Sequence, residues 1–316
     1  MAIKMELQAK IYIAGHKGLI GSAILTKLRE KGYNNLVARS RQELDLTRQQ
    51  DVENFFKIER PEYVILAAAR VGGIKANISY PADFIFENLA IQNNVMHSAY
   101  LYGVNKLLFF GSACSYPRES PQPMKEEYLL SAKLEPTNEP YAVAKIAGIK
   151  MCQAYNRQYG TNFISAIPAN TYGPGDNFDP DDAHVIAALI RKFYEAKINK
   201  APSLSVWGSG NVRREFIYAD DVADAAIFLM NDYGGREIIN LGAGSDLTIK
   251  ELAELIKKIT AYEGQIFYDI SKPEGVTQKL LDTSRLRDLG WQAKIPLSQG
   301  LERAYRWHVE REVLCR

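Results

Sequence analysis

Three regularly spaced glycines constrain the fold of this chain more than any other feature of its sequence. Residues 10–14 form a short, largely apolar run typical of a buried strand, and Gly15, Gly18 and Gly21 follow before a segment with helical periodicity at 22–31. A strand, a glycine turn and a helix in this order allow a tight turn and let a pyrophosphate approach the positive end of the helix. A purely structural turn is the alternative, but the position after the first strand favours dinucleotide binding.

The segments that follow alternate between the two kinds of periodicity. Apolar runs of strand length occur at 35–38, 63–69, 106–110, 163–168 and 237–242. Helical spacing of apolar residues separates them, most clearly at 51–59 and 83–102. Strands and helices that alternate through short connections predict an α/β fold with a Rossmann-type, doubly wound parallel sheet.

Length and charge limit the class of protein. The chain has 316 residues, and 47% of them are hydrophobic. This length exceeds that of one typical domain, about 150 residues. We expect an NADP-binding Rossmann domain at 1–172 with about 215–245, and a smaller C-terminal α/β substrate lobe at 173–214 with about 246–316. The net charge of +2 provides no global field to attract nucleic acid or an anionic membrane.

The three cysteines are Cys114, Cys152 and Cys315, an odd number without metal-type spacing. They predict neither a disulfide framework nor a metal site. The amino terminus has no visible signal peptide, and no apolar run approaches the ~20 residues that span a bilayer. These features favour a cytoplasmic protein.

Basic residues follow the second expected strand, at 35–38. A cofactor with a free ribose 2′-hydroxyl usually requires an acidic residue there, whereas this chain has Arg39 and Arg41. Guanidinium groups match a phosphate, so the pair favours NADP(H), with Lys17 of the glycine turn adding charge. Solvated arginines are the alternative. Asp45 would either accept a hydrogen bond from the adenine amine or cap a helix.

Tyr141 and Lys145 are four residues apart in a helical segment, so they lie on one face of the helix. A fixed ammonium group favours the phenolate, and we therefore expect Lys145 to lower the pKa of Tyr141. The same spacing is common on solvated helix faces. Ser112 follows the run 106–110 at the expected carboxyl edge of the sheet, where ligands collect. The three side chains should meet beside a nicotinamide.

Ser112, Tyr141 and Lys145 match the catalytic set of the extended short-chain dehydrogenase/reductase family, which the chain resembles over nearly its whole length. More specific motifs narrow the resemblance to members that act on GDP-4-keto-6-deoxy-D-mannose; they lie at 71–74, 135–141, 172–178 and 206–210. The resemblance implies epimerisation at C3 and C5 and an NADPH-dependent reduction at C4. A reductase or epimerase for another GDP-4-keto-deoxy sugar, and a non-catalytic dinucleotide-binding regulator, are the alternatives.

The resemblance also assigns roles to single residues. It implies that Cys114 and His184 exchange protons with the sugar. The alternatives are structural roles: Cys114 as a small buried side chain, and His184 as a surface or capping residue. It adds Asn170 and His184 to Tyr141 and Lys145 as cofactor-binding residues. Ala113 departs from the Ser or Thr that is usual between the catalytic serine and the cysteine.

The expected substrate site lies in the second half of the chain. By the same resemblance Lys192, Arg214 and Lys279 contact GDP, with Trp207 near them; a solvated side chain is the alternative for each basic residue. A grip on a diphosphate needs such cations. Similar enzymes are homodimers paired through two helices, for which 83–102 and 141–159 are the candidates.

Overall fold

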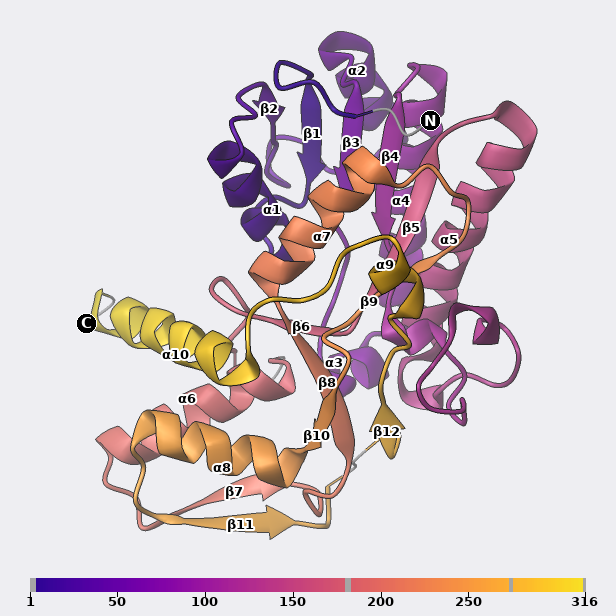
Figure 1. The fold of residues 1–316 in the computed structure, drawn as a ribbon. Helices are drawn as coiled ribbons and strands as arrows, with labels where there is room; N and C mark the ends of the chain where they lie inside the picture. The colour runs from indigo at the N-terminus through magenta and orange to yellow at the C-terminus, as the bar shows by residue number, and fades with distance from the viewer. Residues whose placement is uncertain (1–3, 180–182, 273–274, 315–316) are drawn as a thin grey trace.

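The computed structural model describes residues 4–179, 183–272 and 275–314, so Cys315 lies outside the described residues (Figure 1). A six-stranded parallel sheet forms the large part of the molecule, in the order β2-β1-β3-β4-β5-β9. Its strands are β1 (Ile11–Ala14), β2 (Leu36–Val37), β3 (Tyr63–Leu66), β4 (Lys106–Phe110), β5 (Phe163–Pro168) and β9 (Ile239–Leu241). Every residue of β1, β3 and β4 is buried, as expected where helices cover both faces.

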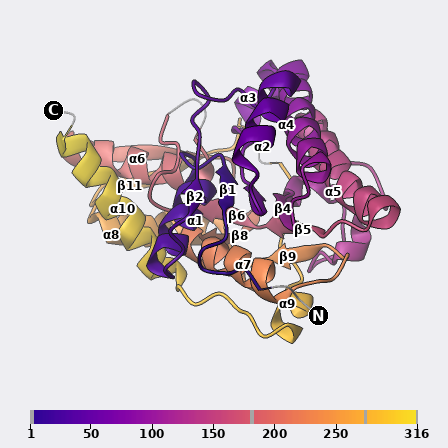
Figure 2. The same cartoon turned by 90° about the horizontal axis from the view of Figure 1, so that it is seen from above.

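Helices cover the sheet on both sides (Figure 2). One face carries α2 (Gln49–Glu59), α4 (Pro81–Leu101) and α5 (Glu139–Tyr159), which pack side by side. The other carries α1 (Leu19–Glu30) and α7 (Ala219–Asp232). From β1 the chain moves outward to β2 and then returns to β3 on the opposite side of β1. That reversal opens a crevice at the carboxyl ends of β1 and β3, where doubly wound sheets bind ligands.

A buried lysine ties the sheet to one of these helices. Lys106 begins β4 and is only 1% exposed, and its ammonium donates to the carbonyls of Leu229 at 2.7 Å and Met230 at 2.9 Å, and also to that of Tyr233. These carbonyls belong to the end of α7, where the helix dipole favours a cation. The contact fixes α7 across β4.

The second part of the molecule is built on two smaller sheets. The first has the order β10-β8-β12, with β6 also paired to β8, and the second pairs β11 with β7. Their strands are β6 (Asn170–Tyr172), β7 (Ser203–Trp207), β8 (Arg213–Tyr218), β10 (Asp246–Thr248), β11 (Gln265–Asp269) and β12 (Gln278–Lys279). The helices α6 (Val185–Ile198), α8 (Ile249–Thr260) and α10 (Leu297–Leu314) pack on them, whereas α3 (Ile74–Ser79) and α9 (Ser284–Asp288) are short connectors. Thr248 and Glu251 form a capping box at the start of α8.

The prediction of a doubly wound α/β fold is confirmed, while several details differ. The first helix begins at Leu19 and not at residue 22, because Gly18 already serves as its N-cap. The division into a cofactor domain and a substrate lobe stays a prediction. The observed cores differ from its expected boundaries at three places, the first of which is Tyr172 of β6 in the smaller core. Phe216 and Tyr218 of β8 pack in the smaller core, and Leu281, Leu286 and Trp291 pack in the larger one.

None of the helices in the described part of the chain is long and apolar enough to cross a bilayer.

Candidate active site

The carboxyl end of β4 delivers the first two candidate residues. Ser112 is in extended conformation directly after the strand, and its Oγ accepts a hydrogen bond of 3.2 Å from the backbone N–H of Cys114. That bond caps a single 3-10 turn at Ala113–Ser115. The hydroxyl and the thiol are therefore held two residues apart on a fixed turn at the ligand-binding edge of the sheet.

Helix α5 brings Tyr141 and Lys145 to the same place. The Ser112 hydroxyl is hydrogen-bonded to the Tyr141 side chain, and the Tyr141 ring packs edge-on against Phe84. Lys145 is 4% exposed, donates to the carbonyl of Phe110 at 2.9 Å, and has its Nζ 5.9 Å from the centroid of the Tyr141 ring. The expected convergence of the serine, tyrosine and lysine side chains is present.

The electrostatics of this pair differ from the expectation. Burial raises the pKa of Tyr141 well above its ordinary value, and the nearby Cys114 raises it further, whereas the hydrogen bond from Ser112 lowers it. Burial also lowers the pKa of Lys145 to about 7. The prediction that Lys145 lowers the pKa of Tyr141 is therefore wrong for the protein alone. Helical spacing indicates proximity, but it carries no information on how strongly burial disfavours both charges.

Two donors from other segments point at the sulfur of Cys114. Asn138, three residues before Tyr141, approaches with its Nδ2 at 3.2 Å. Lys279 of β12 approaches with its Nζ at 3.6 Å. The sequence assigned Lys279 only to GDP, and it singled out no role for Asn138, although that residue lies inside the motif 135–141.

His184 lies at the start of α6, in the second part of the molecule. It occupies the N-cap position in extended conformation, its side chain forms no capping hydrogen bond, and it is exposed. Its charge acts on Asp176, a buried carboxyl group whose pKa is raised by burial and lowered by His184. Asp176 accepts from the N–H of Asn177 at 2.8 Å, while its Oδ2 is buried without a partner in the described part of the chain. Sequence reasoning missed Asp176, although it follows the glycines of the motif 172–178.

The close packing around the glycine turn explains why glycine occupies two of its three positions. Gly15 has a φ of +86°, and a Cβ there would lie 2.6 Å from the backbone nitrogen of Ala68. A Cβ on Gly21 would lie 2.1 Å from the carbonyl oxygen of Gly15. Gly18 has ordinary space around it, with 3.5 Å to its nearest neighbour, and it caps α1 without a side chain. The turn therefore needs two glycines for packing, and the third keeps the helix end open to a phosphate.

The basic residues after β2 have acidic neighbours. Arg39 donates to Glu59 at 2.6 Å, and the more exposed Arg41 lies 3.5 Å from Glu87. Lys17 is exposed in the glycine turn. Asp45 accepts from the N–H and the hydroxyl of Thr47, so it stabilises a turn before α2 and does not cap that helix.

Nucleotide-binding candidates of the second part lie on its two small sheets and on α6. Lys192 donates to the carbonyl of Ser205 at 3.2 Å, and its Nζ lies 5.6 Å from the ring centroid of Trp207. Burial lowers the pKa of Lys192. Trp207 is 53% exposed and has a second cation, Lys272, 5.7 Å from its ring centroid. Sequence reasoning missed Lys272.

Two further candidates link these regions. Arg214 lies on β8 opposite Lys279 of β12. Asn170 begins β6 just beyond β5 and donates to the carbonyl of Glu215 at 2.8 Å. The contact of Lys279 with Cys114 brings the pair of β8 and β12 to the segment that follows β4.

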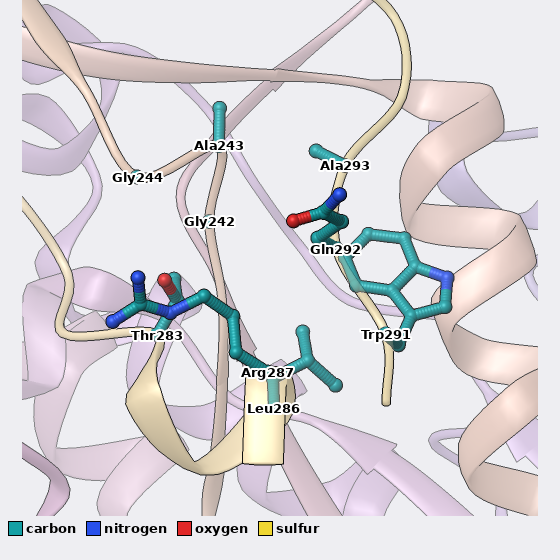
Figure 3. Close-up of a pocket in the computed structure, with 9 residues that line it drawn as sticks. All are labelled: Gly242, Ala243, Gly244, Thr283, Leu286, Arg287, Trp291, Gln292 and Ala293. Atoms are coloured by element: carbon teal, nitrogen blue, oxygen red, sulfur yellow. The ribbon is translucent and has the colours of Figure 1, made fainter. Parts of the chain in front are cut away.

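A separate hollow of about 190 Å³ lies beyond β9, between the backbone of Gly242–Gly244 and the side chains of α9 and Trp291 (Figure 3). None of the candidate residues lines it. Three or more His, Cys, Asp or Glu side chains arranged to hold a metal are also absent from the residues that the structure describes.

Comparison with known families identifies the chain. The model of the NAD dependent epimerase/dehydratase family matches residues 11–242, which include the glycine turn and the Ser112, Tyr141 and Lys145 cluster. The chain belongs to this family. The family resemblance expected from the sequence is thereby confirmed.

Within the family, the chain is similar to proteins that handle GDP-sugars. It is 57% identical to GDP-L-fucose synthase 1 of Arabidopsis thaliana over 96% of this chain and 94% of that protein. It is 50% identical to the GDP-L-fucose synthase of Escherichia coli over 96% of this chain and 97% of that one. Among solved structures, a GDP-mannoheptose C4 reductase from Campylobacter jejuni with NADP bound is 43% identical, with a TM-score of 0.88 over 96% of this chain and 99% of that chain.

Proposed function

We propose that this protein catalyses the NADPH-dependent 3,5-epimerisation and 4-keto reduction of GDP-4-keto-6-deoxy-D-mannose, which forms GDP-L-fucose. One observation carries the proposal. The thiol of Cys114 lies in the same cluster as the hydroxyls of Ser112 and Tyr141. A ketone oxygen held by these hydroxyls would bring the neighbouring carbons of the sugar within reach of the thiol.

Epimerisation is the first use of the ketone. The C4 carbonyl acidifies the protons on C3 and C5, so a base removes one of them to form an enolate and an acid returns a proton to the opposite face. Cys114 and His184 take these two roles in our proposal, because they belong to different parts of the molecule and can approach the ring from different sides.

The second reaction of the C4 ketone is its reduction. Bound NADPH supplies the hydride that reaches C4. Ser112 holds the C4 oxygen, and Tyr141 gives its hydroxyl proton to that oxygen as the carbonyl becomes an alcohol. Lys145 holds the nicotinamide ribose from beneath the tyrosine, where its contact with the Phe110 carbonyl fixes its position.

The residues present fit an NADP cofactor. Gly18 leaves the amino end of α1 open to the pyrophosphate, and Arg39, Arg41 and Lys17 supply positive charge for a 2′-phosphate. Asn170, Asp45 and His184 complete the proposed cofactor site. The NADP bound to the related C4 reductase supports this choice.

GDP would bind across the second part of the molecule. Trp207 offers an exposed ring for guanine, and Lys192, Arg214 and Lys279 supply cations for the diphosphate. The names of relatives that are more than half identical to the chain support the fucose product. The related C4 reductase supports a second candidate, the reduction of another GDP-4-keto sugar without epimerisation.

We also propose a cytoplasmic homodimer. A thiol that exchanges protons must stay reduced, which suits a reducing compartment. The surface of α4 and α5 exposes apolar side chains, with Phe86 at 68%, Leu101 at 49%, Val143 at 40% and Tyr159 at 45% exposure. Two copies paired through these helices would bury that face.

Product analysis tests the function. The purified protein is incubated with NADPH and GDP-4-keto-6-deoxy-D-mannose in deuterated water, and the product is identified by NMR. We expect GDP-L-fucose with deuterium at C3 and C5. A 6-deoxyhexose that retains the manno configuration at both carbons would favour the second candidate, and NADPH binding without turnover would contradict both.

Substitution of Cys114 by Ala separates the two reactions. We expect most deuterium uptake at C3 and C5 to be lost, because the base is gone, while the hydroxyls that serve the reduction remain. Deuterium uptake equal to that of the unmodified enzyme would remove Cys114 from the mechanism.

A further inference from the structure

We propose that Lys279 and Asn138 are positioning residues that hold Cys114 in its thiolate form. The inference rests on the proposed function, in which Cys114 exchanges protons with the sugar, and adds the residues that make a thiol fit for that task. Lys279 was expected only as a contact for GDP. Its position beside the sulfur gives it a second role, in the chemistry itself.

The geometry around the sulfur is the first support. The Sγ of Cys114 has an amide nitrogen of Asn138 at 3.2 Å and the ammonium nitrogen of Lys279 at 3.6 Å. The two donors come from different segments, one before α5 and one on β12. A thiolate accepts hydrogen bonds more strongly than a thiol, and a neighbouring cation favours the charged form.

The backbone around Lys279 is fixed on both sides, which is the second support. On one side Lys279 pairs with Arg214 of β8. On the other, the N–H of Leu280 donates to the side chain of Gln122 at 2.8 Å, and the carbonyl of Leu280 accepts from Met124 at 2.7 Å. Gln122 and Met124 belong to the segment that follows Cys114 along the chain. The lysine is thus anchored to the same part of the protein as its target.

One more bond strengthens the anchor. The N–H of Leu281 donates to the buried carboxyl group of Glu215 at 2.8 Å, so the residues after Lys279 are also tied to β8. Because its backbone is fixed, Lys279 loses little conformational freedom when its ammonium group contacts the sulfur. An ammonium group has three donors, so contact with the sulfur leaves others for the substrate diphosphate.

The reactivity of the thiol in the protein without substrate tests this inference directly. Alkylation by iodoacetamide requires the thiolate, and mass spectrometry of the peptide that carries Cys114 separates it from the other cysteines. In Lys279→Met we expect the rate at neutral pH to fall about tenfold and the pH profile to move to higher pH. In Asn138→Ala we expect a fall of about threefold, since a neutral donor is lost.

Two variants control the experiment. Lys279→Arg keeps the cation and should recover much of the rate, whereas Lys258→Met removes an exposed lysine of α8 and should leave the profile unchanged. An unchanged profile in folded Lys279→Met would overturn the proposal and would leave Lys279 as a GDP contact alone. If that variant does not fold, Lys279→Gln, which removes the charge and keeps a polar side chain, and Asn138→Ala decide: two profiles equal to that of the unmodified protein would equally overturn the proposal.

Deuterium uptake links the result to catalysis. With GDP-4-keto-6-deoxy-D-mannose present, Lys279→Met should shift the pH profile of uptake at C3 and C5 in the same direction as the alkylation profile. Should Cys114→Ala keep its uptake, the proposed function of Cys114 fails, while alkylation still measures the effect of Lys279. The two failures are therefore distinguishable.

Discussion

The two parts of the molecule present their candidate residues in different ways. At the carboxyl edge of the large sheet, Ser112, Tyr141 and Lys145 are joined to one another or to the backbone before any ligand arrives. In the second part, His184 and Trp207 are exposed and face outward from the ends of their elements. The difference indicates that the groups proposed for the reduction are held in advance, while His184 and Trp207 gain their final contacts only when the substrate binds.

The largest effect is expected from a substitution in the cluster of Ser112, Tyr141 and Lys145. Tyr141→Phe removes the hydroxyl that bonds to Ser112 and leaves the ring that packs on Phe84. We expect the rate of NADPH oxidation to fall about a thousandfold, because the proton for the C4 oxygen is lost. Circular dichroism and NADPH titration should match the unmodified protein. Reduction within threefold of the normal rate would contradict the role of Tyr141.

The next effect lies at the junction of the two parts, where Glu215 is buried and accepts from Gly244 and Leu281. Burial raises the pKa of Glu215 to about 7, so the folded protein binds a proton that the unfolded chain releases above its ordinary value of 4.5. The stability from this group is fully present below that value and is lost as the pH rises through about 7, a change of about 3 kcal/mol.

Glu215→Gln should remove that pH dependence. It should also destabilise the fold by about 1 to 3 kcal/mol, because the amide offers one acceptor where the carboxyl group offers two. Urea unfolding at pH values on either side of the transition measures both effects. A Gln variant with the same slope as the unmodified protein would show that another group titrates.

A smaller effect is expected from the glycine turn. Gly21→Ala would place its Cβ 2.1 Å from the Gly15 carbonyl oxygen, and we expect a loss of about 1 to 3 kcal/mol in unfolding free energy. Gly18→Ala is the matched variant, since its Cβ has ordinary space. It should unfold like the unmodified protein but bind NADPH more weakly. Equal stability of both variants in urea would contradict the packing role of Gly21.

The smallest effect tests the exposed side. Trp207→Ala removes a ring that is 53% exposed and contacts two lysines. We expect KM for the GDP-sugar to rise about tenfold with kcat changed less than threefold, since our proposal assigns the ring to nucleotide binding and to no reacting atom. Steady-state kinetics at saturating NADPH provide the measurement. A fall in kcat without a change in KM would show that Trp207 acts in the reaction and not in nucleotide binding.

The sequence predicted most of the large sheet, because its signals are local. The runs 106–110 and 163–168 are strands with those bounds, and the spacing of Tyr141 and Lys145 was sufficient to place them on one helix face. The expected cofactor domain also included residues from about 215, whereas β8 lies outside the large sheet. Phe216 and Tyr218 belong to the smaller core, and a strand that alternates between two cores has no distinct periodicity.

Two features of the site could not be read from the sequence. The pKa of Tyr141 depends on burial, which dominates over the neighbouring lysine. The contact between Lys279 and Cys114 joins residues far apart in the chain, and the pairing of β12 with β8 and the bonds of Leu280 to Gln122 and Met124 bring them together. Long-range contacts of this kind leave no local pattern.

The return of the chain to the large core after β12 has a consequence for synthesis. The core includes β9, which is synthesised before β10, β11 and β12, and the side chains of Leu281, Leu286 and Trp291, which are synthesised after every strand of the small sheets. The amino-terminal half therefore emerges with its sixth strand missing and one edge of β5 unpaired. We infer that the nascent protein completes the large sheet and its core only when its last quarter has been translated, which makes carboxyl-terminal truncation costly for the whole molecule.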